Sequence, residues 1–478
     1  MSASPAGASR DRALAGVVIA VALVAYAMAP GTAFQYDDFR VVVIDRDVHS
    51  WGAWWSSMPG MRPLTKASYV ANWLVSPKPA GFAVAGVAMH VASSLLVLAL
   101  ARRWIGALAP SISHPAIAAL ATALVFALHP AQTEAIVYIA GRSTALSSLA
   151  TLGALHAWER ARDGRTPWRV GAWLLFAAAM GARESAWTLP FLLVLVEVAR
   201  GAGLRDAIRR TTAFWLLFAA LAAAVLAVPA YRQLLATSLA IRGPLDNLVA
   251  QVGAIAYLVT QPLVTLRVNF DPGLVARDAI DAAWLAQAAT LVALTILGCA
   301  SLRRRPWLGF GILWFLLALL PTHGPLARYE LANDRQLYLA IVGPALIVGV
   351  GLASWTARAT ASIALALLSA VLAAATFVRV TDYASETRLW EATVRAAPGN
   401  ARAWNNLGLA YELAGDRDRA REAYRRALVI DPAHPKAASN LDALHPAGDP
   451  APREPARGPN AGKGADGAVQ LGQPPGPR

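Results

Sequence analysis

The chain contains a series of long stretches that lack Asp, Glu, Lys and Arg, and this feature limits its possible folds more than any other. An α-helix needs about 20 apolar residues to cross a hydrocarbon core of about 30 Å. Stretches long enough to do so lie between residues 12 and 37, 210 and 232, 246 and 267, 281 and 303, 305 and 328, 335 and 358, and 358 and 379. The sequence therefore predicts an all-α, polytopic membrane domain.

Composition and charge support this prediction. Only 15% of the 478 residues are charged, whereas a soluble globular protein carries roughly 25%. The net charge of +14 could suggest a nucleic acid partner, but such proteins gather their basic residues on a soluble face. Here the arginines lie at the ends of apolar stretches, as in the cytoplasmic loops of membrane proteins. We therefore expect no nucleic acid partner and interpret as topological markers the basic clusters at 102–103, 160–169, 200–210 and 303–305.

Placing these basic clusters on the cytoplasmic side predicts about eleven spans. We expect them near residues 13–31, 81–101, 115–129, 143–159, 169–183, 185–199, 212–230, 282–302, 306–321, 337–356 and 360–378. The N-terminus is then cytoplasmic, and the loop 32–80 is extracytoplasmic. Whether 246–267 also spans stays open, but crossing there would place the cluster 303–305 outside, which favours a re-entrant or interfacial segment.

Three regions follow one another along the chain. We expect a membrane domain at 1–380, a helical module at 381–445, and a disordered tail at 446–478 because that tail is rich in Pro and Gly. The module matches the pattern of a tetratricopeptide repeat of about 34 residues at Trp404, Leu407, Gly408, Tyr411, Ala420, Tyr424, Ala427 and Pro432. Fewer than about three repeats rarely fold alone, so we expect the module to pack on the membrane domain.

Acidic residues collect on the predicted outer side. The adjacent pair Asp37 and Asp38 follows the first span directly, where a carboxylate meets both the membrane surface and water. Arginines occupy span ends on the same side, at Arg62, Arg142, Arg183 and Arg335. This asymmetry indicates an outward-facing polar site.

Several ordered segments resemble a known family. They are FQYDDFRVVVIDRDVHSW, MRPLTKASYVANWLV, GFAVAGVAMHVASSLLVLAL, ALVFALHPAQTEAIVYIAGRSTALSSLA and NDRQLYL. They resemble the transmembrane and tetratricopeptide-repeat (TMTC) family of O-mannosyltransferases and its bacterial relatives, over most of residues 30–445. The fourth segment is similar to the family's HPxxTEA and GR block, and the fifth to its ERxLYLPS segment.

The resemblance implies a glycosyltransferase of the GT-C fold in a bacterial cytoplasmic membrane. Its donor would be a polyprenyl-phosphate sugar, with mannose as the first candidate, and its acceptors the hydroxyl groups of exported proteins. A carboxylate would remove the acceptor proton, and arginines would stabilise the departing phosphate. The implied catalytic residues are Asp37 and Asp38, and the implied substrate-binding residues are His129, Glu134, Arg142, Arg183, Glu184, Asp334 and Arg335. The position of Arg62 on the predicted outer side makes it a further candidate for substrate binding. Asp334 stands where the family has Glu, and Arg183 where it has Lys.

Two alternatives remain at this stage. The enzyme could act on a surface glycan or lipopolysaccharide instead of on proteins, or the chain could be a non-catalytic scaffold that docks partners through its repeats. In the first hypothesis the segment from Trp404 to Pro432 would contribute to binding of protein acceptors. We assign no cofactor and no metal ligands, and a divalent metal is not excluded. The sugar, the acceptor, the prenyl length and the oligomeric state stay open.

Overall fold

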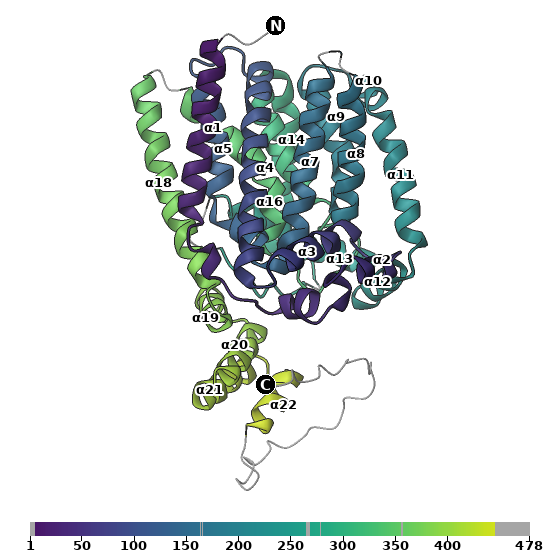
Figure 1. The fold of residues 1–478 in the computed structure, drawn as a ribbon, viewed down its shortest axis with the longest axis vertical. Helices are drawn as coiled ribbons and strands as arrows, with labels where there is room; N and C mark the ends of the chain where they lie inside the picture. Colours follow the sequence, from purple (N-terminus) through teal and green to yellow (C-terminus); the bar gives the residue numbers. More distant parts are fainter. Residues whose placement is uncertain are drawn as a thin grey trace.

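The computed structural model describes residues 5–162, 164, 166–263, 268–277, 279–354 and 357–444, and these residues fold into helices joined by loops and turns (Figure 1). The predicted disordered tail at 446–478 lies outside the described residues.

Long apolar helices run side by side and form a bundle (Figure 1). Its members are α1 (Pro5–Ala25), α4 (Pro79–Leu108), α5 (Pro115–Leu128), α7 (Arg142–Ala161), α8 (Thr166–Ala182), α9 (Leu189–Ala199), α11 (Thr212–Ala227), α14 (Ala282–Arg304), α15 (Pro306–Leu319), α17 (Val342–Ala353) and α18 (Arg358–Asp382). Small residues allow close helix approach: a Cβ atom on Gly343 of α17 would lie 2.2 Å from the carbonyl oxygen of Gly311 in α15.

Four helices are long and apolar enough to cross a membrane, within Ser9–Gly31, Pro79–Leu108, Ala282–Arg304 and Arg358–Asp382. The number rises to seven if each of three bent helix pairs is one span. These pairs are α5 with Pro130–Val137 (bent by 51°), α10 (Leu204–Arg210) with α11 (61°), and Asp334–Ala340 with α17 (55°). The chain is therefore an integral membrane protein with several candidate spans. This criterion of helix length and hydropathy does not test the predicted number of about eleven spans.

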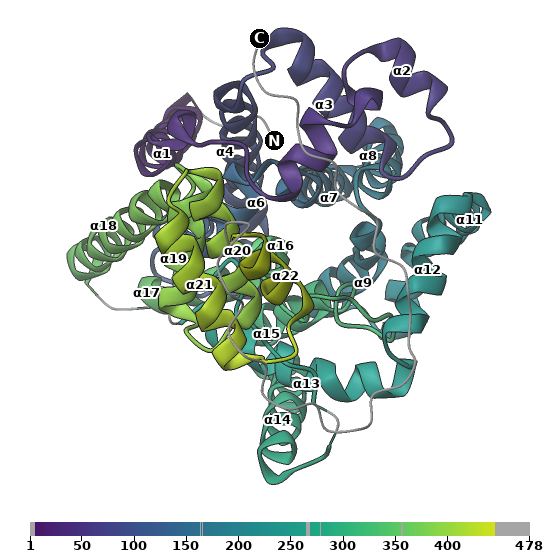
Figure 2. The same ribbon diagram turned by 90° about the horizontal axis from the view of Figure 1, so that it is seen from below.

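The two ends of the bundle differ. The start of α1 and the whole of α10 lie at the upper end in Figure 1, whereas α2 (Trp51–Ser56), α3 (Pro63–Val75), α12 (Pro229–Ile241) and α13 (Pro244–Thr260) lie at the lower end. The predicted loop 32–80 thus contains two helices that sequence periodicity did not reveal. Within the described part of the 246–267 segment, α13 is not a candidate span and lies across the lower end (Figure 2). Residues 264–267 are not described.

The C-terminal helices form the repeat, with α19 (Glu386–Ala396), α20 (Ala401–Leu413), α21 (Arg417–Ile430) and α22 (Pro435–Ala443). The two central helices touch where the pattern requires a small residue. A Cβ atom on Gly408 would lie 2.5 Å from the ring of Tyr424, and Ala420 is fully buried. Gly415, with φ of +85°, makes the turn between α20 and α21. The small residues of the repeat pattern thus lie where α20 and α21 meet.

The repeat packs on the membrane domain at the lower end of the bundle (Figures 1 and 2). The guanidinium of Arg402 lies 2.7 Å from the carboxylate of Asp271, and the amide of Asn400 donates a hydrogen bond of 3.1 Å to the Asp271 carbonyl. Trp390 of α19 makes an edge-on contact with Phe270, with ring centroids 5.4 Å apart. The short module therefore has the support that we expected.

Candidate functional site

Asp38 is anchored in the backbone of a distant segment. Its Oδ1 atom accepts a hydrogen bond of 2.7 Å from the Ala140 amide, and its Oδ2 atom accepts one of 3.1 Å from the Gln35 amide. The side chain is 1% exposed. Burial raises the pKa of Asp38 to about 8, although the hydrogen bonds from Ala140 and Gln35 oppose this shift and the neighbouring Asp37 adds to it. Asp38 thus fixes the start of the loop 32–80 against the segment that follows α6 (Thr133–Val137).

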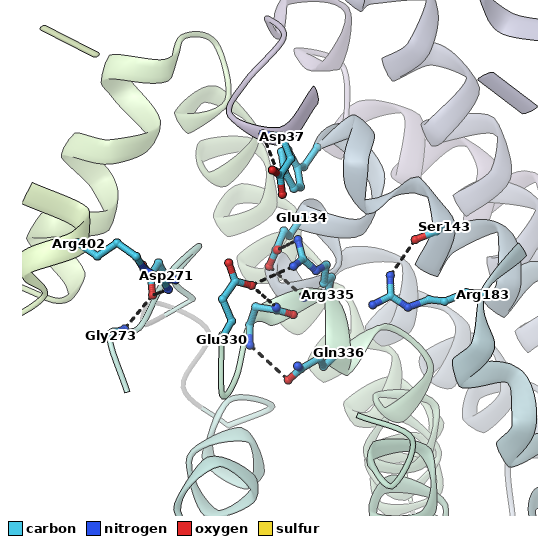
Figure 3. A network of polar contacts seen from close by, with 12 residues as sticks. Asp37, Glu134, Ser143, Arg183, Asp271, Gly273, Glu330, Arg335, Gln336 and Arg402 are labelled. Carbon is cyan, nitrogen blue, oxygen red and sulfur yellow. Dashed lines mark hydrogen bonds and ion pairs between the residues drawn. The ribbon is translucent and has the colours of Figure 1, made fainter. Parts of the chain in front are cut away.

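Asp37 lies beside this anchor and is only partly buried. Its backbone amide donates a hydrogen bond of 3.3 Å to the hydroxyl of Tyr138. The guanidinium of Arg335 lies over the ring of the same tyrosine, 5.9 Å from its centroid. Tyr138 therefore joins the acidic pair to Arg335, and Figure 3 shows Asp37 close to Glu134 and Arg335.

Arg335 is held by two carboxylates. Its Nη1 atom lies 3.1 Å from Oε1 of Glu134, and its Nη2 atom lies 3.0 Å from Oε2 of Glu330 (Figure 3). Glu330 also accepts a hydrogen bond of 2.9 Å from the amide of Asn333. Two ion pairs fix the direction of this guanidinium while it stays partly accessible, with 17% of its side chain exposed.

Arg183 and Arg335 line one small cavity of about 30 Å³. Nη1 of Arg183 donates a hydrogen bond of 2.8 Å to the Ser143 hydroxyl (Figure 3). Hydroxyl groups form much of the remaining wall, from Thr144, Ser147, Ser148, Thr151, Ser185, Thr188 and Thr322. The four on α7 have the spacing of one helix face, so the sequence carried this signal, and our sequence analysis missed it.

Arg62 and Glu184 form a bidentate ion pair near Arg183. Nε of Arg62 lies 2.9 Å from Oε1 of Glu184, and Nη2 lies 2.9 Å from Oε2. Burial of Glu184 favours its neutral form, but the charges and hydrogen bonds of Arg62, together with Arg183, outweigh this effect and lower the pKa of Glu184 to about 2. Arg62 has a positive φ of +50° at the start of α3, and this backbone turn directs its side chain toward Glu184.

Arg328 is a further cation that sequence reasoning missed. Burial, together with the charges of Arg335 and Arg62, lowers the pKa of Arg328 to about 10. Within the part of the chain that the structure describes, no ion pair or hydrogen bond engages its guanidinium. Arg328 precedes the predicted NDRQLYL segment by five residues and lies outside every apolar stretch, so charge position along the sequence could have indicated it.

Two predicted substrate-binding residues serve the fold. Arg142 donates hydrogen bonds to the Ser68 and Phe82 carbonyls, at 3.3 and 2.9 Å, and to the Asn72 side chain at 2.8 Å. These bonds tie α7 to α3 and α4. His129 is 2% exposed, and its Nδ1 atom accepts a hydrogen bond of 3.2 Å from the Ala131 amide, which caps the short helix after α5.

Asp334, the remaining predicted site residue, directly precedes Arg335 in the chain. Its side chain is 1% exposed, and its Oδ2 atom lies 4.0 Å from Nη2 of Arg379 at the end of α18. Asp334 therefore connects the site to the helix that leads into the repeat.

Comparisons with known proteins show which sequences the chain is similar to. The tetratricopeptide repeat family matches residues 401–434. The protein O-mannosyl-transferase Tmtc2 of Drosophila melanogaster is 28% identical over 38% of this chain and 21% of its own length. The human protein O-mannosyl-transferase TMTC3 is 23% identical over 84% of this chain and 49% of its own length. The human TMTC4 protein is 27% identical over 38% of this chain and 29% of its own length.

The chain is a distant relative of the TMTC protein O-mannosyltransferases. It spans about half or less of the length of these TMTC proteins. No solved structure matches the chain.

Among the described residues, no group of three or more His, Cys, Asp or Glu side chains could hold a metal ion. The charges that the structure gathers instead are guanidinium groups, from Arg62, Arg183, Arg328 and Arg335, balanced in part by Glu134, Glu184 and Glu330.

Proposed function

We propose that the protein is a membrane glycosyltransferase that moves a sugar from a polyprenyl-phosphate donor to hydroxyl groups of extracytoplasmic proteins. The names of its relatives favour mannose as the sugar. One observation carries the proposal: Asp37 and Arg335, 298 positions apart in sequence, meet around Tyr138 at one end of the bundle. A carboxylate and a fixed guanidinium within one site are what sugar transfer from a phosphate requires.

The two carboxylates of the acidic pair have different roles in this proposal. Both oxygen atoms of Asp38 accept backbone hydrogen bonds, and its raised pKa leaves it largely protonated at neutral pH. A protonated, buried acid cannot serve as a base. Asp37 is more exposed, so we assign it the role of general base and Asp38 that of its anchor.

The reaction balances without a further reactant. The acceptor hydroxyl oxygen attacks the anomeric carbon, the bond from that carbon to the phosphate oxygen breaks, and Asp37 takes the hydroxyl proton. The phosphate gains one negative charge as it leaves. Arg335 and Arg183 line the adjoining cavity and Arg328 has no carboxylate partner among the described residues, so these guanidinium groups would stabilise the new charge.

We further propose that α7, α8, α9 and α15 also cross the membrane, which together with the four candidate spans and the three bent pairs gives about eleven crossings. The basic α10 would then face the cytoplasm, and Asp37 and the repeat would face the other side. The positions of α10, α13 and the repeat in Figure 1 support this orientation.

The test uses the purified full-length protein in detergent with a polyprenyl-phosphate mannose donor and serine- or threonine-containing peptides. We expect Asp37→Asn to lower the rate of transfer by at least about 100-fold, the size of effect typical of general base removal. The matched control is Asp47→Asn. Asp47 lies in the same loop as Asp37, and its carboxylate pairs with Lys66. Wild-type rates in Asp37→Asn, or an equal loss in both variants, would contradict the proposed base.

A further inference from the structure

A second charged cavity lies at the opposite end of the bundle from the candidate site. It has a volume of about 470 Å³ and is bounded by the ends of α7 and α9, by α8, and by α10 and the start of α11. In Figure 1 this is the upper end, where α10 lies, whereas the acidic pair and the repeat lie at the lower end. The proposed transfer reaction makes no use of this cavity.

The lining of this upper cavity is strongly basic. It includes four arginines, Arg162, Arg169, Arg209 and Arg210, and among the described lining residues one carboxylate, Glu197. An excess of three positive charges at one opening favours an anionic ligand.

Both carboxylate oxygens of Glu197 contact other residues of the cavity wall. It is 1% exposed; its Oε2 atom lies 3.0 Å from Nη1 of Arg210, and its Oε1 atom pairs with Nη2 of Arg162. Oε1 also accepts a hydrogen bond of 3.1 Å from the indole of Trp158. This buried carboxylate therefore orients two of the four arginines toward one space.

Arg169 and Arg209 remain available for a ligand. Both are exposed, and no ion pair engages either of them within the part of the chain that the structure describes. They approach the cavity from different helices, α8 and α10. Two guanidinium groups that arrive from separate helices can each bind two oxygens of one phosphate.

The remaining wall is apolar. Trp158, Trp173 and Phe214 line the same cavity, and 36% of Trp173 is exposed. A small soluble anion has no apolar part to bury against these rings, whereas a lipid has both a charged headgroup and acyl chains. Tryptophan is also enriched at the level of lipid headgroups.

We propose that the upper cavity binds the phosphate of an anionic membrane lipid. Arg169 and Arg209 contact the phosphate, Arg162 and Arg210 add charge behind it, and Trp173 packs against the proximal part of an acyl chain. The lipid would connect α8 and α10 at the membrane surface opposite the candidate site.

The test measures lipid retained by the purified full-length protein in native mass spectrometry, after exposure to phosphatidylglycerol or to phosphatidylcholine. We expect preferential retention of phosphatidylglycerol, and a fall of about 30-fold in its affinity in Arg169→Ala/Arg209→Ala, equivalent to about 1 kcal/mol per arginine. The control is Arg303→Ala/Arg304→Ala. These exposed arginines are the last two residues of α14. The first turn of α14 lies beside α13 at the lower end, since the Trp284 indole donates a hydrogen bond of 2.9 Å to the Val249 carbonyl, so Arg303 and Arg304 lie toward the upper end, as the cavity does.

Three outcomes would overturn the proposal. They are equal retention of the two lipids, equal losses in the test and control variants, and displacement of bound lipid by millimolar inorganic phosphate, which would indicate a soluble anion site. Trp173→Ala adds a second check, since it should weaken lipid retention. None of these measurements depends on sugar transfer.

Discussion

Arg335 holds Glu134 through two contacts, although 201 residues separate them in the sequence. Nη1 of Arg335 lies 3.1 Å from Oε1 of Glu134, and the backbone amide of Arg335 donates a hydrogen bond of 3.0 Å to Oε2. Glu134 is 1% exposed. One carboxylate thus fixes both the main chain and the side chain of the arginine that faces the acidic pair.

This arrangement predicts that Arg335→Ala lowers the turnover rate of sugar transfer by about 100- to 1000-fold, the usual effect of removing one preorganised donor from a developing negative charge. Arg335→Lys should recover little activity because an ammonium group cannot satisfy Glu134 and Glu330 with one planar fork. Transfer rates and elution profiles in detergent check both variants. The matched control is Arg304→Ala at the other end of the bundle; if it is equally impaired, Arg335 has no special role.

Asp38 predicts a pH dependence of stability. Burial raises its pKa in the folded protein to about 8, above the value of about 3.9 in an unfolded chain. The folded state therefore binds the proton more tightly, and stability falls as pH rises from about 4 to about 8 and then levels off. Asp38→Asn should flatten this slope. Thermal unfolding of the detergent-solubilised protein between pH 5 and 9 measures it.

The control for that slope is Asp418→Asn, because the Asp418 side chain is 95% exposed. This variant should keep the wild-type pH dependence. A slope that is unchanged in Asp38→Asn would show that another group carries the titration.

The contact between α20 and α21 predicts a steric effect. Gly408→Ala would place a Cβ atom 2.5 Å from the ring of Tyr424, and overpacking of this kind costs about 1–3 kcal/mol. We expect faster limited proteolysis of the repeat in the full-length protein. Gly399→Ala is the control, since nothing lies within 4 Å of its added Cβ atom; equal protease sensitivity of the two variants would exclude close packing at Gly408.

The pair of Arg402 and Asp271 predicts coupling between the repeat and the membrane domain. In a double-mutant cycle, Arg402→Ala and Asp271→Ala should be coupled by at most about 1 kcal/mol because Arg402 is partly exposed. Hydrogen exchange at residues 268–277 and in α20 should accelerate in either variant. Arg425→Ala, an exposed change on α21, should leave exchange at 268–277 unchanged, and strict additivity in the cycle would mean that the ion pair does not fasten the repeat.

The sequence was most informative where apolar length decides structure. The predicted segment 81–101 corresponds to α4, 143–159 to α7, and 360–378 to α18, because a helix in lipid must satisfy its own backbone hydrogen bonds. The repeat was equally predictable, since Gly408 and Tyr424 have to interlock in sequence order. In both cases the information is local.

The site was less predictable because its contacts are not local. Nothing in sequence spacing pairs Glu134 with Arg335 or Arg62 with Glu184. Closeness in sequence would suggest a pairing of Glu134 with Arg142, but Arg142 donates to Asn72 and to the carbonyl oxygens of Ser68 and Phe82. Arg328 lies only seven residues before Arg335, and its position at the end of an apolar stretch could have indicated it, but only the fold brings it near Arg62.

The repeat is fastened to the membrane domain through α19 and the start of α20, while α21 and α22 extend away from the bundle (Figure 1). The repeat module could therefore be lengthened only at its α22 end. Additional helix pairs stacked beyond α22 would lengthen the arm without disturbing Asp271, Phe270 or the loop that carries the acidic pair. An architecture of this kind allows the reach toward large partners to change while the membrane-embedded chemistry stays as it is.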